Sequence, residues 1–236
     1  MKKDFKISLQ EAAWYVYSFL RNPELGRLAK EEALGGTITK AGLLRALPLK
    51  FKGAMGWFCR NMKKDPRFPP LFIAFEKGEY DIGQVPPVPK TDPLIYPIET
   101  FTFSSDLSEE NVRNMIFNDQ RSFTDPDGEI YQVDLLDFIN RLPIDPMGQP
   151  YNRYACSFFE TEIDSDLRNF LSTPGLAAVR YYFGYNDSDI YHNLSNRIRV
   201  IFIGVDAQGK NIPPAGAIDV PTFSMLQNSW PPPPPY

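Results

Sequence analysis

The stretches LAAVRYYFGY (residues 176 to 185) and RIRVIFIGV (residues 197 to 205) decide the fold of this 236-residue chain. Both consist mainly of β-branched and aromatic residues, which are typical of strands, and the polar residues 186 to 189 lie between them. We therefore predict two neighbouring antiparallel strands, followed by a tight turn at residues 206 to 209.

Amphipathic helices are predicted mainly in the part of the chain before these strands. Ser8 and Glu11 have the spacing of a capping box, and apolar residues then recur at helical intervals up to Asn22. Periodicity and capping residues predict further helices over residues 37 or 39 to 47, 51–62, 109–121, 133–142 and 167–171. The order of these elements, with helices first and strands later, predicts the α+β class. We expect N-terminal and central helices packed on a small antiparallel sheet formed mainly by the C-terminal third.

The proline pattern predicts how the chain is divided. Short apolar runs at residues 71–75 and 98–103 predict strands, and five prolines between residues 84 and 97 predict an extended connection. We therefore expect a helical region with one short strand (1–83), a Pro-rich connection (84–97), an α+β region (98–229) and a polyproline tail (230–236). The alternative is that the whole chain forms one compact domain.

The composition is that of an ordinary folded protein, with 43% apolar and 23% charged residues. No apolar run approaches the ~20 residues of a membrane span, and the N-terminus lacks the pattern of a secretory signal, so we expect no transmembrane segment. Cys59 and Cys156 lie far apart among large apolar residues, which is typical of reduced thiols. We therefore expect a cytoplasmic location.

The sequence offers little that favours catalysis. The single histidine, His192, lies in a polar stretch, and no paired-cysteine, histidine-pair or phosphate-loop motif occurs. We expect a noncatalytic chain without a cofactor. An enzyme that uses carboxylates alone is the least favoured alternative.

One acidic loop partly resembles a calcium-binding EF-hand loop. With Gly128 as the turn glycine, Asp125, Asp127 and Asp134 occupy ligand positions. Phe123 stands where the first oxygen ligand should be, so an acidic turn joining two helices is the favoured alternative.

Positive charge is concentrated between residues 40 and 67, where eight Lys or Arg and one Asp give a net charge of +7 against −4 for the whole chain. As a basic amphipathic helix this stretch could bind nucleic acid or an anionic membrane surface, or dock on the acidic remainder of a second copy. A solvated helix face is the alternative without a binding role. The candidate binding residues are Lys50, Lys52, Trp57, Arg60, Lys63 and Lys64.

The last residues form a polyproline segment, in which Trp230 precedes five prolines and Tyr236. Pro233, Pro234 and Tyr236 resemble the Pro-Pro-x-Tyr ligand of WW domains, which predicts recruitment of a protein partner. A tail that packs on its own domain or is solvated is the alternative.

Three features near the C-terminus are the RYYFGY strand at residues 180–185, the VDAQGK turn at residues 205–210 and the closing LQNS before the prolines. Taken together, they resemble a loosely defined group of uncharacterised Bacteroidetes-type bacterial proteins. The likeness covers about the last quarter to third of the chain. The group often ends in a Cys/Pro-rich tail, whereas this chain has proline alone, and it implies no activity.

Together these observations predict a noncatalytic structural or protein-interaction component, such as a subunit of a larger assembly, that binds a protein partner or itself. The alternative is an accessory protein that binds nucleic acid or an anionic membrane surface through residues 40–67.

Overall fold

The computed structural model describes the chain in separate segments. The described residues are 6–31, 33–46, 53–60, 71–76, 80–81, 88–89, 94–95, 99–121, 123, 131–132, 155–159, 166–186, 197–212 and 222–227. Their strands form two larger sheets and a two-stranded one.

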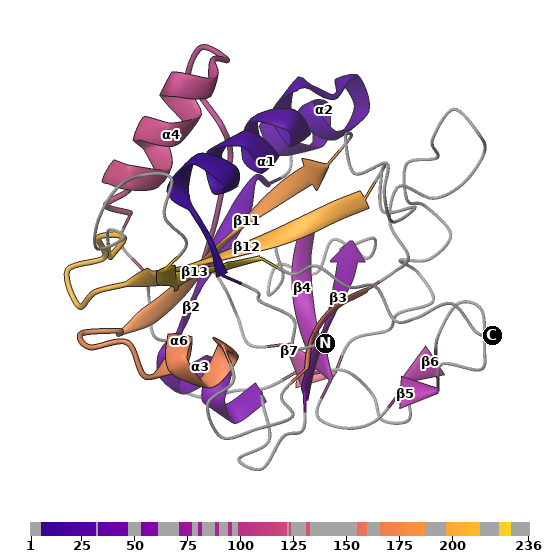
Figure 1. Cartoon of the computed structure of the whole chain (residues 1–236). Helices are drawn as coiled ribbons and strands as arrows, with labels where there is room; N and C mark the ends of the chain where they lie inside the picture. The colour runs from indigo at the N-terminus through magenta and orange to yellow at the C-terminus, as the bar shows by residue number, and fades with distance from the viewer. Residues whose placement is uncertain are drawn as a thin grey trace.

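The antiparallel strand pair predicted from the sequence forms the centre of the larger sheet. β11 (Ala178–Asn186) and β12 (Arg197–Val205) pair without interruption along their whole length. The sheet has the order β1-β13-β12-β11-β2-β8, and all its neighbouring strands are antiparallel (Figure 1). Its other strands are β1 (Lys6–Ile7), β13 (Thr222–Gln227), β2 (Gly35–Thr39) and β8 (Glu99–Phe101).

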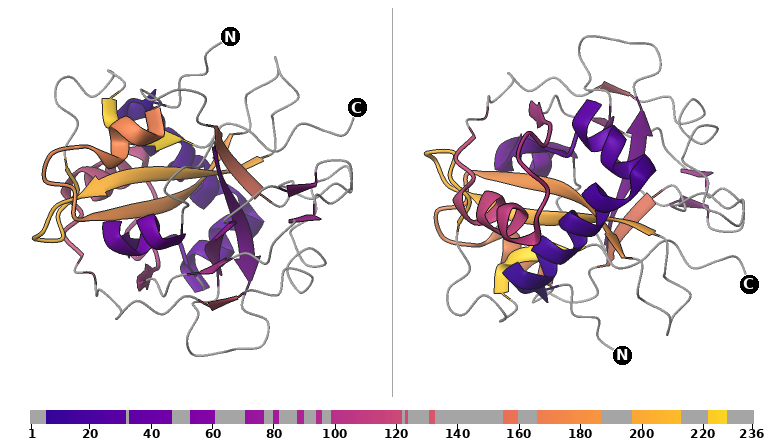
Figure 2. Two further views of the ribbon diagram at one scale, coloured as in Figure 1. Left: turned by 90° about the horizontal axis from the view of Figure 1, so that it is seen from below. Right: turned by 90° about the horizontal axis from the view of Figure 1, so that it is seen from above.

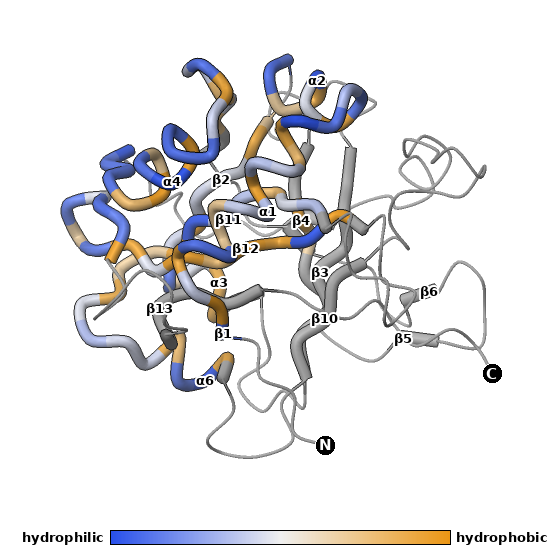
Figure 3. The backbone as a smooth tube through the Cα atoms, turned by 45° about the horizontal axis from the view of Figure 1, so that its top comes forward, coloured by the Kyte–Doolittle hydropathy of each residue, from blue (hydrophilic) through white to orange (hydrophobic). Residues whose placement is uncertain are grey.

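Helices cover both faces of this sheet. The views from below and above place α1, α2 and α4 on one face and α3 and α6 on the other (Figure 2). Figure 3 shows hydrophilic and hydrophobic residues alternating along α1, α2 and α4, as expected for helices with one solvated face. The helices are α1 (Leu9–Arg21), α2 (Pro23–Glu31), α3 (Lys40–Ala46), α4 (Glu109–Asn118) and α6 (Asp166–Leu171).

The predicted capping box begins α1. The Ser8 hydroxyl accepts a hydrogen bond from the Glu11 backbone N–H at 3.1 Å, and the Glu11 carboxylate accepts one from the Ser8 N–H at 2.9 Å. The helix ends at Arg21, as predicted. The Asn22 side chain then accepts hydrogen bonds from the backbone N–H groups of Glu24 and Leu25, both at 3.1 Å, and Pro23 is the first residue of α2. Asn22 and Pro23 are thus start signals for a helix that the sequence analysis did not predict.

Buried aromatic side chains pack the helices against the larger sheet. Phe19 of α1 stacks on Phe183 of β11 with ring centroids 5.9 Å apart. Phe170 of α6 stacks on Phe202 of β12 with ring centroids 6.5 Å apart. Burial of these rings stabilises the packing of these helices on the sheet.

The second sheet has the order β10-β3-β4-β7-β9. Ile73 of β4 is buried and belongs to the same apolar core as α1 and β11, so the two sheets share that core. The strands are β10 (Ala155–Phe159), β3 (Gly53–Arg60), β4 (Leu71–Glu76), β7 (Leu94–Ile95) and β9 (Tyr131–Gln132). The two-stranded sheet pairs β5 (Tyr80–Asp81) with β6 (Val88–Pro89).

The α+β class is confirmed, and so are the predicted strands at β4, β8, β11 and β12 and the predicted helices α1, α3, α4 and α6. The larger sheet, however, also takes β1, β2 and β8 from the first half of the chain. Residues 1–83 therefore contribute several strands rather than one, and strands from both sides of residues 84–97 join each of the two larger sheets.

The helix predicted over residues 51–62 is wrong, because residues 53–60 form β3. This strand pairs with β4 along one edge and β10 along the other. Gly53 and Gly56 each disfavour a helix by about 1 kcal/mol, and pairing on both sides supplies the backbone hydrogen bonds that a helix would have made. Phe58 and Met55 satisfied a helical period by chance.

In the described part of the chain, no helix combines the length and the apolar character that crossing a membrane requires. The helix predicted over residues 133–142 and the polyproline tail lie outside the described residues.

Candidate functional site: an amide-lined depression on α4

A buried arginine joins the larger sheet to the end of α4. Arg180 lies in β11 with no exposed surface. Its Nε donates to Thr37 Oγ1 of β2 at 3.0 Å and its Nη1 to Asn211 Oδ1 at 2.7 Å. Its Nη2 donates to the carbonyl oxygens of Arg121 at 2.6 Å and Gly209 at 3.1 Å. This guanidinium therefore joins β11 to three segments that are distant in sequence, which are β2, the residues after α4 and the turn after β12.

Asp119, the C-cap residue of α4, supplies the negative charge beside Arg180. Its side chain is only 3% exposed, and it forms ion pairs with Arg121 and with Arg180, the latter at 3.5 Å. Its Oδ2 also accepts a hydrogen bond of 2.6 Å from the Tyr182 hydroxyl. The side-chain amide of Asn211 donates to the Tyr182 oxygen at 3.1 Å and to the Ile116 carbonyl at 2.7 Å.

The surroundings of Tyr182 keep its hydroxyl protonated. Burial raises the pKa of Tyr182 far above its usual value, and the adjacent Asp119 carboxylate raises it further. The hydroxyl therefore donates to Asp119 over the whole ordinary pH range. Every polar group of this buried cluster has partners within the fold, so we assign the cluster a structural role in holding the end of α4.

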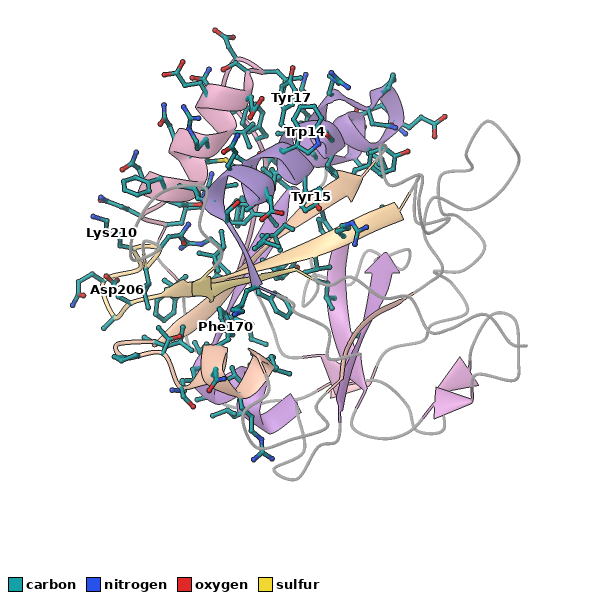
Figure 4. All side chains as sticks on the ribbon, viewed as in Figure 1. Trp14, Tyr15, Tyr17, Phe170, Asp206 and Lys210 are labelled. Carbon is teal, nitrogen blue, oxygen red and sulfur yellow. The ribbon has the colours of Figure 1, made fainter. Side chains whose placement is uncertain are left out.

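The turn after β12 contributes through its backbone. Asp206 Oδ1 accepts hydrogen bonds from the N–H groups of Gln208 and Lys210, both at 2.9 Å. Gly209 has a φ of 81°, which favours glycine, and this conformation accompanies the Gly209 carbonyl bond to Arg180. The VDAQGK sequence predicted this tight turn, and Figure 4 shows Asp206 and Lys210 projecting from it.

An open depression of about 750 Å³ lies along α4, and Asp119 and Arg121 of the buried cluster are part of its lining. Its polar character comes mainly from carboxamides, which are Asn111, Asn114, Asn118 and Gln120. Met115 is the single apolar side chain among the described residues that line it. The volume is in the range of ligand sites, but the lining is more polar than theirs.

Three of the carboxamides that line the depression are available to a ligand. Asn114, Asn118 and Gln120 are exposed, and within the described part of the chain their side chains make no hydrogen bond. Asn111 differs, because its Nδ2 donates to the Asp106 carbonyl at 2.8 Å. The amides of Asn114 and Asn118 follow each other on one side of α4, since they are four residues apart.

Exposed apolar side chains stand at both ends of α4. Leu107, just before the helix, is 39% exposed, and Phe117, in its last turn, is 43% exposed. Leu44 of α3, at 38%, is the other large apolar side chain of comparable exposure among the described residues, and α3 lies on the opposite face of the sheet. Two exposed apolar side chains thus lie near the ends of the helix that lines the depression.

The neighbouring helix α1 adds aromatic groups to this layer. Figure 4 shows Trp14 and Tyr17 on its outer side, whereas Tyr15 points toward β12. The rings of Trp14 and Tyr17 are 6.1 Å apart, and the Arg21 guanidinium lies 6.0 Å and 5.7 Å from their centroids. Aromatic and arginine side chains are common in protein interfaces.

The structure describes few of the binding residues predicted from the sequence. Trp57 and Arg60 lie in β3, and Arg60 is the last residue of that strand, opposite Leu71. The amphipathic basic helix that would have joined them does not form. The remaining candidates lie outside the described residues, and these are Lys50, Lys52, Lys63, Lys64, Trp230, Pro233, Pro234 and Tyr236.

The calcium hypothesis also falls outside the described residues, because Asp125, Asp127 and Asp134 are not among them. Among the residues that are described, no group of three or more His, Cys, Asp or Glu side chains is arranged to hold a metal ion.

The sequence analysis did not predict the depression, although the sequence contains a signal for it. The segment DLSEENVRNMIFNDQR (residues 106–121) repeats asparagine on one side of a predicted helix. Asparagine favours helix ends over helix interiors, so Asn114 in the middle of this helix indicates a use other than stability.

Comparisons of the chain with protein-family models, with curated proteins and with solved structures find no match.

Proposed function

We propose that this chain is a noncatalytic interaction component of a larger assembly, and that a protein partner binds the outer surface of α4. The observation that supports this proposal is the set of exposed carboxamides that make no hydrogen bond within the described residues, together with two exposed apolar side chains, Leu107 just before α4 and Phe117 in its last turn. Protein interfaces combine a few apolar anchors with hydrogen-bonding groups around them.

The buried cluster beneath α4 supports the same proposal. It fixes the helix end to β2, β11 and the turn after β12 through charged hydrogen bonds. A surface that is already rigid loses less conformational entropy when a partner binds, and this favours affinity. The ionisable groups of the cluster serve the fold, whereas the neutral amides face outward.

Recovery of the native complex tests the proposal. The full chain is purified under mild cross-linking from the cells that produce it, alongside the variants Phe117→Asp and Leu44→Asp. We expect a defined partner to co-purify with the unchanged chain and with Leu44→Asp, and to be lost with Phe117→Asp. Retention of the same partner by Phe117→Asp, or recovery of no partner, would contradict the proposed surface.

A further inference from the structure

We infer that the partner presents an extended peptide segment that lies along α4 and is held through its backbone by the Asn114 and Asn118 carboxamides. This inference rests on the proposed function and specifies the chemistry of its ligand. Four features of the described residues support it.

The first feature is the hydrogen-bonding chemistry of the depression. A side-chain carboxamide has one carbonyl acceptor and two N–H donors, so it matches the N–H and C=O groups of a peptide backbone. Asn114 and Asn118 are both exposed, and the hydrogen bonds of the described residues leave their carboxamides unused. A neutral ligand with alternating donors and acceptors fits them better than an ionic one.

The second feature is spacing. At a rise of about 1.5 Å per residue, Asn114 and Asn118 are roughly 6 Å apart along the helix axis. An extended peptide repeats every second residue, at about 6.6 Å. Two carboxamides at this separation can form hydrogen bonds with the backbone groups of alternate residues of one extended segment. The backbone groups of the residues in between then point away from α4.

The third feature is the pair of apolar ends. From the N-cap Ser108 to Phe117 the axis of α4 rises by roughly 14 Å, and Leu107 lies one residue before this N-cap. An extended chain spans that distance in about four or five residues. The matching segment therefore has two apolar side chains about four or five positions apart, one for each end of α4.

The fourth feature is charge. Residues 105–121 contain four carboxylates and two arginines, which is a net charge of −2. Asp119 and Arg121 already pair with each other, so the uncompensated charge is acidic. The segment should therefore lack acidic residues, and a basic residue should strengthen its binding at low salt.

Other modes of peptide binding fit less well. Addition of a strand requires a free sheet edge, whereas this depression lies on a helix. A helical ligand requires an apolar groove, and Met115 alone is apolar in the described lining. A neutral glycan could form hydrogen bonds with the same carboxamides. It has neither the two-residue repeat of a peptide backbone nor apolar side chains for Leu107 and Phe117.

The test uses the full chain and a phage-displayed library of random linear 12-residue peptides. Enriched peptides are synthesised with a fluorophore, and their affinity is measured by fluorescence polarisation for the unchanged chain and for Asn114→Ala/Asn118→Ala. Gln10→Ala, which removes an exposed amide from α1, is the matched control. Both substituted asparagines are exposed, and circular dichroism establishes that the variants are folded.

We expect enriched peptides with two apolar residues four or five positions apart and no acidic residue between them. The double variant should lower affinity about tenfold or more, and Gln10→Ala should leave it unchanged. N-methylation of alternate backbone amides should abolish binding, whereas alanine at the positions between the apolar residues should have little effect.

Three results would overturn the inference. They are the absence of enriched peptides, equal affinity for the double variant, and insensitivity to N-methylation. A fourth result that would overturn it comes from an array of neutral oligosaccharides tested in parallel. If the unchanged chain binds a carbohydrate and the double variant does not, the site is assigned to a glycan. If the inference fails while Phe117→Asp still removes the native partner, the proposed function stands with another binding mode.

Discussion

The Tyr182 hydroxyl donates a hydrogen bond of 2.6 Å to Asp119 Oδ2 and thereby joins the central strand β11 to the C-cap of α4. Both residues are buried, and Asp119 would otherwise place a carboxylate in the core with only arginine partners. Several predictions depend on this bond and the cluster around it.

Replacing Tyr182 by Phe should lower the free energy of unfolding by about 1–3 kcal/mol. The substitution removes the donor to Asp119 and the acceptor of the Asn211 amide, while it keeps the ring that contacts Phe101 at 5.3 Å. Urea denaturation measures the change. Tyr17→Phe on α1 is the control and should change stability by less than about 0.5 kcal/mol.

The raised pKa of Tyr182 gives stability a dependence on alkaline pH. Its folded pKa lies above the ordinary value of 10.0, so the unfolded chain loses this proton first. The contribution is complete below pH 10 and declines as the pH rises further, by up to about 1.4 kcal/mol per pH unit.

Urea unfolding of the unchanged chain and of Tyr182→Phe, at pH 8 and at about pH 11, measures this contribution. The unchanged chain should lose more stability over the interval than the variant. Equal losses would show that Tyr182 ionises as readily in the folded state as in the unfolded one.

Arg180→Met should destabilise the fold by about 3–5 kcal/mol, because it removes the buried cation beside the Asp119 carboxylate and the donor to the Arg121 and Gly209 carbonyl groups. Arg180→Lys should recover only part of this loss, since one ammonium group cannot reach all the acceptors of the planar guanidinium. Thermal unfolding followed by circular dichroism measures both variants.

The control for Arg180 is Arg27→Lys. Arg27 pairs with Glu31 on the surface of α2, where the two side chains are 60% and 57% exposed. That change should alter stability by less than about 0.5 kcal/mol. Full stability of Arg180→Lys would refute the argument that guanidinium geometry holds the cluster.

Gly184→Ala should destabilise the contact between β11 and α1. A Cβ atom at residue 184 would lie 2.9 Å from the Cβ of Tyr15, closer than folded proteins allow. Overpacking of this kind costs about 1–3 kcal/mol. Denaturant unfolding measures the cost, and wild-type stability would mean that α1 shifts away from the sheet without penalty.

Ser8→Ala should lower stability by about 1 kcal/mol, because it removes the acceptor for the Glu11 N–H at the start of α1. Ser8→Asp should restore most of this loss, since aspartate also accepts at an N-cap. Thermal melts of the two variants check the prediction, and equal melting temperatures for both would contradict the capping role.

Local signals predicted the parts of the fold that depend on neighbouring residues. The capping box at Ser8 and the strand runs around Val179 and Ile201 act over a few residues, and they were sufficient. The sequence could not separate helix from strand at residues 53–60, because Met55 and Phe58 fit a helical period while the deciding partners lie in β4 and β10.

The buried cluster could not be predicted for a related reason. Arg180 bonds to Thr37, Asn211 and the Asp119 carbonyl, which are 143, 31 and 61 positions away in the sequence. An arginine within an apolar strand indicates a buried charge, but it does not indicate which partners neutralise it. The asparagine spacing on α4, in contrast, was visible in the sequence and went unused.

The Arg180 guanidinium also limits how the chain can be shortened. Its acceptors come from β2, from the residues after α4 and from the turn after β12. A fragment that lacks even one of these three segments would bury the guanidinium without all of its hydrogen-bond acceptors. Deletion of the first 39 residues or of everything after Val205 should therefore yield insoluble or unfolded material. A minimal folded version of this protein must keep β2, the residues after α4 and the turn after β12.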